Sequence, residues 1–357
     1  MLLKTCSSKS VEEQFSSIYC EMLESGFCSS DILVFCMSPA QKSRFTELVK
    51  AKTKTDFLEK INVHTFFGYC YNTVKENFYL LQENLFLNDT LLQPNLCGLE
   101  VSGSIFKECI DDNCFKDYNS KKNLLHQLFK RHNLIVQNVL SDEDVKLRSK
   151  TLGETFYDDA QYVLEKFEQK TYEYCSFDYI RQMSLFEYLY KNFDILKNIK
   201  VLFWLDADEA PPLLYDFVSH ISKQLENYFV AFDPNGSSKR GYLCAETNAQ
   251  EKLEEIFKTK SIENSFVPQK ILNFEKEGKI TLPFLCVSKY LDMLDCAFNK
   301  VKELIENKIS RNEIVIVTPS LNDTLKFYAE EKFNKYLSRV GYRVEVVFYD
   351  TQEPVRV

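Results

Sequence analysis

Three acidic side chains stand together where a strongly apolar segment ends. The segment "VLFWLDADEAPPLLYDF" runs from Val201 to Phe217, and its apolar start leads directly to Asp206, Asp208 and Glu209. An unbroken apolar run is typical of a parallel strand that is covered on both faces. Because open α/β sheets bind ligands at the carboxyl ends of their strands, these acids are candidates for a Mg²⁺-nucleotide site or for the remains of one.

The first ten residues, "MLLKTCSSKS", contain a weak counterpart of a phosphate-binding loop. Such a loop consists of a strand, the pattern G-x-x-x-x-G-K-[ST] and a helix, and its backbone N–H groups and Lys hold phosphates. Lys9 and Ser10 fill the last two positions, whereas Leu3 and Ser8 stand at the two glycine positions. The alternative is a chance Lys-Ser pair before a helix. The nucleotide-binding candidates are Ser7, Ser8, Lys9 and Ser10, and the metal-binding candidates are Ser10 and Asp206.

Alternating strand and helix patterns must position these residues. Strands are predicted at 31–37, 61–67, 200–206, 227–233, 313–319 and 342–350. Amphipathic helices are predicted between them, for example at 10–26 and 289–308. The first of these has Ser10 and Glu13 in capping-box spacing and stops at Gly26. The alternation favours a doubly wound parallel sheet, and the mostly helical pattern between about 70 and 198 predicts a helical insertion.

The order of these motifs resembles the first half of the UvrD/Rep/PcrA group of superfamily 1 DNA helicases. After the first ten residues, the matching segments are "DILVFCMSPAQKSRFTELV", "INVHTFFGYC", the acidic strand end, "VAFDPNGSSKRGYL" and "ENSFVPQKIL". The resemblance covers residues 1–275 and continues more weakly to 350. It implies an α/β fold with a RecA-like P-loop domain (1–70 and 186–275), a helical insertion (71–185) and the start of a second, incomplete RecA-like domain (276–357).

The resemblance also implies an ATP-dependent 3′–5′ DNA helicase that uses ATP and Mg²⁺. Asp206 and Asp208 take the catalytic positions. His64, Thr65 and Phe66 fall in the loop that contacts single-stranded DNA, where an aromatic ring could stack on a base. The structural alternative for these three residues is a strand end followed by a capped helix. A basic cluster could line a DNA channel or form a solvated face, and it consists of Lys121, Lys122, Lys130 and Arg131.

Several departures from the family pattern predict impaired ATP hydrolysis. In the family a Tyr follows an acidic motif whose Asp holds the metal ion and whose Glu polarises the attacking water. If Tyr215 is taken as that Tyr, Leu205 falls at the position of the Asp and Asp206 at the position of the Glu. The competing register starts the motif at Asp206 itself. Gly236 replaces a Gln of the family, and Phe266 stands where the family has an Arg that reaches the γ-phosphate.

Two functional hypotheses follow from the resemblance and its departures. One is an ATP-driven helicase module that a second chain completes. The other is a non-catalytic pseudo-helicase, which acts as a DNA-binding or scaffold subunit in DNA repair or recombination. We expect the family's adenine-reading segment and its last two motifs to have no counterpart between Met1 and Val357.

The composition of the chain limits which binding partners and which cellular compartment are expected. A net charge of −8 argues against bulk attraction to nucleic acid but leaves room for a local basic groove. The twelve cysteines form no C-x-x-C pair, which predicts reduced thiols in a cytoplasmic protein. The four scattered histidines disfavour a zinc site, and no stretch approaches the roughly 18 apolar residues of a membrane span. The expected partner is single-stranded DNA, with no membrane contact.

Overall fold

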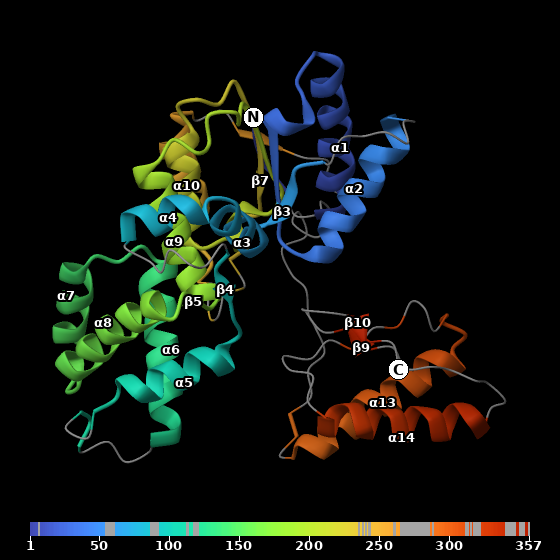
Figure 1. Ribbon diagram of the computed structural model, residues 1–357. Coiled ribbons are helices and arrows are strands. Elements are labelled where there is room, and N and C mark those ends of the chain that lie inside the picture. The colour runs from blue at the N-terminus through green and yellow to red at the C-terminus, as the bar shows by residue number, and fades with distance from the viewer. Residues whose placement is uncertain are drawn as a thin grey trace. The chain divides into compact units, whose positions relative to one another are not determined.

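The structure is a computed structural model, which describes most of the chain. The described residues are 1–5, 8–53, 61–85, 93–111, 114–116, 121–234, 236–237, 239, 241, 244–259, 262–264, 286–287, 289–310, 314, 316, 323–339, 348–349 and 354–355. The chain divides into two compact units, Met1–Leu272 and Asn273–Val357. The first unit contains the sheet and the acidic strand end (Figure 1).

A parallel sheet forms the centre of the first unit, with the strand order β3-β2-β6-β7-β1-β8. Every neighbouring pair in it is parallel. The strands are β1 (Leu2–Lys4), β2 (Ile32–Cys36), β3 (Val63–Thr65), β6 (Val201–Trp204), β7 (Asn227–Phe232) and β8 (Ile262–Asn264). This arrangement confirms the predicted α/β class, and four of the six predicted strands lie in this sheet.

Helices cover both faces of the sheet, because alternate strand residues point to opposite sides. Leu3, Val34 and Phe203 belong to the core on the side of α1 (Ser8–Glu24) and α2 (Pro39–Thr53). Phe35 and Trp204 belong to the core on the other side. The helices there are α3 (Phe66–Glu76), α9 (Tyr179–Asn192), α10 (Pro212–Ile221) and α11 (Ala249–Phe257). Burial on both faces explains why the strand sequences are continuous apolar runs.

The stretch between β3 and β6 is mostly helical. Besides α3 and α9 it contains α4 (Phe78–Leu85), α5 (Leu99–Cys109), α6 (Lys121–Gln137), α7 (Asp142–Leu152) and α8 (Tyr157–Glu173). Helices α5, α6 and α8 share a separate core, in which the rings of Phe106 and Phe167 stack at 3.7 Å between centroids. A short parallel pair, β4 (Asn95–Leu96) and β5 (Ser176–Phe177), was not predicted.

Two predicted element boundaries differ from the structure. Helix α1 begins at Ser8, so Ser10 lies in its first turn and not at the predicted cap position. Phe66 and Phe67, predicted as strand, begin α3 because the Thr65 hydroxyl accepts the Gly68 N–H at 3.2 Å and caps the helix. The predicted stop of α1 at Gly26 is confirmed: its φ is +98°, and its N–H donates to the Leu23 carbonyl.

The second unit contains α13 (Tyr290–Glu306), which confirms the helix predicted at 289–308. It also contains α14 (Asp323–Arg339), whose Phe333 lies 5.2 Å from Phe298 of α13 between ring centroids. Strands β9 (Phe348–Tyr349) and β10 (Pro354–Val355) pair in antiparallel orientation. The strand predicted at 313–319 lies largely outside the described residues, and of 342–350 only β9 is described.

None of the helices in the described part of the chain is both long enough and apolar enough to span a membrane.

Candidate functional site

The predicted acidic site lies at the carboxyl edge of the sheet. Asp206 and Asp208 follow β6, and Asp233 follows β7. One strand, β7, lies between β6 and β1, so the ends of β6 and β1 are about two strand spacings, roughly 10 Å, apart. The start of α1, with Lys9 and Ser10, therefore belongs to the same edge as the acids.

Asp206 is tied to helix α2. Its Oδ2 accepts a hydrogen bond of 2.5 Å from Nε2 of Gln41, a buried residue. The Gln41 side chain is itself fixed, because its Oε1 accepts the Met37 N–H at 2.6 Å. Burial raises the pKa of Asp206; the Gln41 hydrogen bond opposes this shift, and the nearby charge of Glu12 adds to it. One oxygen of this metal candidate is thus engaged by protein.

Asp208 binds the backbone of the loop that follows β7. Its Oδ1 accepts the Asp233 N–H at 2.9 Å, and its Oδ2 accepts the Ser237 N–H at 3.4 Å. The side chain is buried, and burial raises its pKa to about 6. A Cβ on Gly236 would lie 1.8 Å from Asp208 Oδ2, so any other residue would displace the Asp208 carboxylate. This contact is a physical reason for a glycine at position 236.

Glu209 and Tyr215 complete the same corner. Glu209 Oε2 accepts the Lys239 N–H at 2.9 Å, and the Tyr215 hydroxyl donates to the Ala207 carbonyl at 2.7 Å. The three acids after β6 therefore each hold a different segment. Leu205, at the metal-holding position of the preferred register, is fully buried in the core under α1 and α2.

Leu3 differs from its expected place in a phosphate loop. It is the middle residue of β1 and pairs with Ala231 on one side and Glu263 on the other, so the first glycine position of the pattern lies inside a strand. Of Ser8, Lys9 and Ser10 only the backbone is described, as the first residues of α1, and Ser7 lies outside the described residues. Their assignment to nucleotide and metal binding stays a prediction.

An ion pair between a buried carboxylate and a half-exposed arginine, near the start of α1, was not predicted from the sequence. Glu12 is buried, and Arg44 of α2 donates to it through Nε at 2.9 Å and Nη2 at 2.7 Å. The two residues lie 32 positions apart, and no periodic pattern predicts a pairing between two helices over such a separation. The pair adds a carboxylate to an edge that already holds four, which are Asp206, Asp208, Glu209 and Asp233.

His64, Thr65 and Phe66 each have a structural contact. A ring nitrogen of His64, Nε2, hydrogen bonds to Asn62 Oδ1 at 2.8 Å, and Thr65 caps α3. Phe66 is only 6% exposed and packs edge-on against Phe35 and Phe186. These contacts match the strand end with a capped helix, and the burial of Phe66 disfavours stacking of its ring on a base. DNA binding by this loop stays a prediction.

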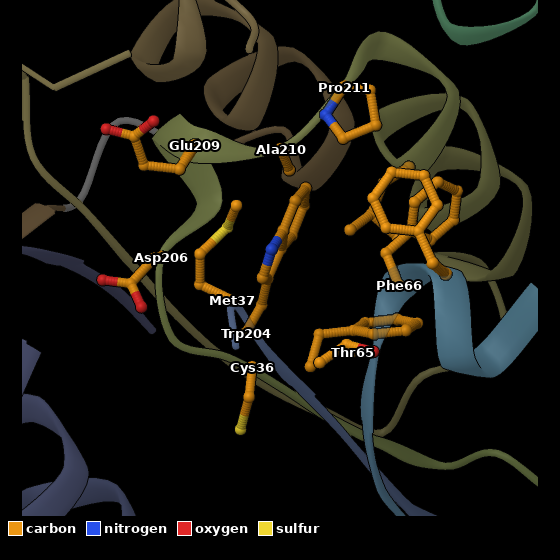
Figure 2. A pocket seen from close by; sticks show the side chains of 12 residues that line it. Cys36, Met37, Thr65, Phe66, Trp204, Asp206, Glu209, Ala210 and Pro211 are labelled. Carbon is orange, nitrogen blue, oxygen red and sulfur yellow. The ribbon is translucent and has the colours of Figure 1, made fainter. Parts of the chain in front are cut away.

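A small cavity lies between the strand ends and α10. It has a volume of ≈ 40 Å³ and is lined by Trp204, Thr65, Phe66 and Pro211 among others. In Figure 2 the carboxylates of Asp206 and Glu209 lie on one side of Trp204, and Phe66 and Pro211 lie on the other. The cavity is large enough for ordered water but not for a base or a nucleotide, whose pockets start at about 300 Å³.

The basic cluster on α6 is described only in part. Lys130 is exposed, whereas Arg131 pairs with Glu154 at 2.5 Å. The side chains of Lys121 and Lys122 lie outside the description. In the described residues no group of three or more His, Cys, Asp or Glu is arranged to hold a metal ion.

No protein-family model matches the chain, and the curated proteins contain no significant match. The class that the structure defines is an α/β protein whose parallel sheet ends in an acidic, hydrogen-bonded edge.

Proposed function

We propose that this chain is a non-catalytic relative of the UvrD-like DNA helicases, a pseudo-helicase that serves as a DNA-binding or scaffold subunit in DNA repair or recombination. The observation that carries the proposal is the state of the acids after β6. Asp208 accepts backbone N–H groups with both oxygens, and Asp206 accepts the amide of Gln41. Carboxylates that accept such hydrogen bonds connect the loops and helices that donate them.

The residues at this edge fit Mg²⁺-ATP poorly. The carboxylate that would anchor the metal is replaced by buried Leu205, and Leu3 stands inside β1 where a loop glycine belongs. Glu209 adds negative charge that opposes a triphosphate, whereas the charge of Glu12 is compensated by Arg44. A loosely held phosphate at the start of α1 is compatible with this arrangement, but efficient phosphoryl transfer needs a metal ion and cationic groups around the phosphates.

The DNA-binding part of the proposal rests on the resemblance. It is tested by fluorescence anisotropy of a labelled oligo-dT with the full chain over a salt series. We expect binding whose log K falls linearly with log salt, with a slope near −0.7 for each phosphate contacted, and no effect of added ATP. If the chain does not bind at low salt, the DNA-binding role is excluded and the scaffold role remains. ATP-dependent release would contradict the non-catalytic assignment.

A further inference from the structure

A cavity of ≈ 470 Å³ lies within the helical part of the first unit. It is lined by residues of α6, α8 and α9 and by the turn between α6 and α7. That turn contributes Val139, Leu140, Ser141 and Asp142 to the lining. This part of the cavity wall is therefore in place only while the turn and the start of α7 stay where they are.

The turn after α6 requires a left-handed backbone at Val139. The Val139 N–H donates to the Val136 carbonyl at 3.2 Å, and the Leu140 N–H donates to the Ile135 carbonyl at 3.1 Å. This pair of hydrogen bonds is the usual end of a helix whose next residue is left-handed. The φ of Val139 is accordingly +51°.

Valine is an unusual residue for this conformation. Gly26 and Gly153 hold the same position after α1 and α7, where the lack of a Cβ avoids a clash. Among the described residues with positive φ, Val139 is the only one whose side chain branches at Cβ. Such strain persists only where the surrounding structure imposes it. Here the Val139 side chain packs against the main core, and this contact holds the strained backbone in place.

Few side chains attach α7, the helix that follows the strained turn. All of its 11 residues are described, and of these only Val145 and Ser149 are buried. Its two leucines, Leu147 and Leu152, are 65% and 83% exposed. In Figure 1 the helix lies at the outer edge of the helical part of the first unit. Because packing supplies most of the stability of a helix in a protein, α7 is only weakly held against its neighbours.

One arginine connects the end of α7 to α6. Arg131 pairs with Glu154 at 2.5 Å and donates to Ser149 Oγ at 3.5 Å. Glu154 is partly exposed, so solvent weakens this ion pair. The capping box of Ser141 and Asp144 stabilises the helix itself but does not attach it to another element.

We propose that α7 is a lid on this cavity and opens about a hinge at Val139, whose backbone strain is present only in the closed state. Opening releases the left-handed conformation and takes residues 139–142 out of the cavity wall. A detached helix of this length is not stable alone, so α7 unfolds as it leaves. Its N–H groups and those of Val139 and Leu140 then become open to solvent together. The lid involves neither the acidic sheet edge nor DNA.

The test is amide hydrogen exchange of the full chain, followed by mass spectrometry and corrected for intrinsic exchange rates. In the natural chain, the amides of the turn and of α7 should exchange together and at least about 10-fold faster than those of α8.

Val139→Asn is the test variant, because Asn tolerates the left-handed region, and Val139→Thr is the matched control, because Thr keeps the branched Cβ. Relief of the strain stabilises the closed state. The amides of α7 should therefore exchange about 10-fold more slowly in Val139→Asn than in Val139→Thr, whereas those of α8 should exchange alike.

Two outcomes would overturn the proposal. If α7 exchanges at the same rate as α8 in the natural chain, it leaves only when the helical part unfolds as a whole. If α7 exchanges at the same rate in the two variants, Val139 is not a strained hinge. Because neither DNA nor ATP is present, either result leaves the pseudo-helicase proposal untouched, and failure of that proposal leaves this one untouched.

Discussion

At the scale of single residues, the contact between Asp208 and Gly236 determines the shape of the acidic corner. The Asp208 carboxylate lies against the backbone at Gly236 and accepts N–H groups on both sides of it. The side chain is consequently fixed on three sides by protein. A metal ligand needs a free oxygen pointing at the ion, and this geometry leaves Asp208 poorly placed for that role.

Gly236→Ala should destabilise the fold by about 1–3 kcal/mol, the usual range for overpacking, because the new Cβ would displace the Asp208 carboxylate. In an Asp208→Ala background the same change should cost less, since of the close contacts only that with the Asp233 carbonyl, at 3.0 Å, remains. Urea unfolding of the four chains of this cycle measures both values. Gly241→Ala is the control, because nothing lies within 4 Å of its Cβ position. Equal costs in both backgrounds would show that the contact does not exist.

The raised pKa of Asp208 predicts a pH dependence of stability. Burial raises this pKa from 3.8 to about 6, so the fold favours the protonated acid. The protonated acid stabilises the fold fully below pH 3.8, and this stabilisation is lost as the pH rises through 6. The free energy of unfolding should fall by about 3 kcal/mol over this range. The natural chain should therefore lose stability relative to Asp208→Asn between pH 4 and 7, as measured by urea midpoints. If the difference in stability between the two chains stays constant with pH, the pKa of Asp208 is not raised.

At the scale of elements, side chains rather than backbone bonds connect the helices to the sheet edge. Glu12 and Arg44 link α1 to α2, Gln41 links α2 to the end of β6, and Thr65 caps α3 at the end of β3. Polar side-chain contacts thus join two helices to strand ends and one helix to another. The same residue types would be expected in a working nucleotide site, which is why the sequence alone did not separate the two possibilities.

Arg44→Met should destabilise the chain, because it leaves the Glu12 carboxylate buried without its cation. Loss of one partner of a buried pair costs about 3–5 kcal/mol, and the 54% exposure of the Arg44 side chain reduces the expected value to about 1–3 kcal/mol. Lys42→Met, exposed on the same helix, should change stability by less than about 0.5 kcal/mol. Thermal unfolding of both variants decides the matter, and equal shifts would show that the pair is not stabilising.

Phe66→Ala should cost about 3–5 kcal/mol of folding stability, since the ring is buried between Phe35 and Phe186. Tyr71→Ala, on the exposed side of α3, should cost less than about 1 kcal/mol. Chemical unfolding compares the two. A small effect of Phe66→Ala would mean that the ring is free to leave the core, and it would restore Phe66 as a candidate for base stacking.

At the scale of the whole molecule, four of the six strands of the sheet could be predicted from the sequence, but the contacts at its edge could not. Strands β2 and β6 are buried along their whole length, and strands buried on both faces have continuous apolar sequences such as "VLFWL". The contact between Gln41 and Asp206 joins residues 165 positions apart, and a local pattern has no means of pairing them.

The central claim is that the acidic edge connects loops and does not hydrolyse ATP. The direct test measures steady-state ATP hydrolysis by the purified full chain, with Mg²⁺ and with or without single-stranded DNA. An Arg that reaches the γ-phosphate is worth about 10³–10⁵ in rate where phosphoryl transfer depends on it, and the proposed resemblance puts Phe266 at that position, so we expect no turnover above background. Lys9→Ala should leave this background unchanged. ATP hydrolysis that DNA stimulates and that Lys9→Ala abolishes would contradict the account. Asp206 would then be the candidate metal ligand again.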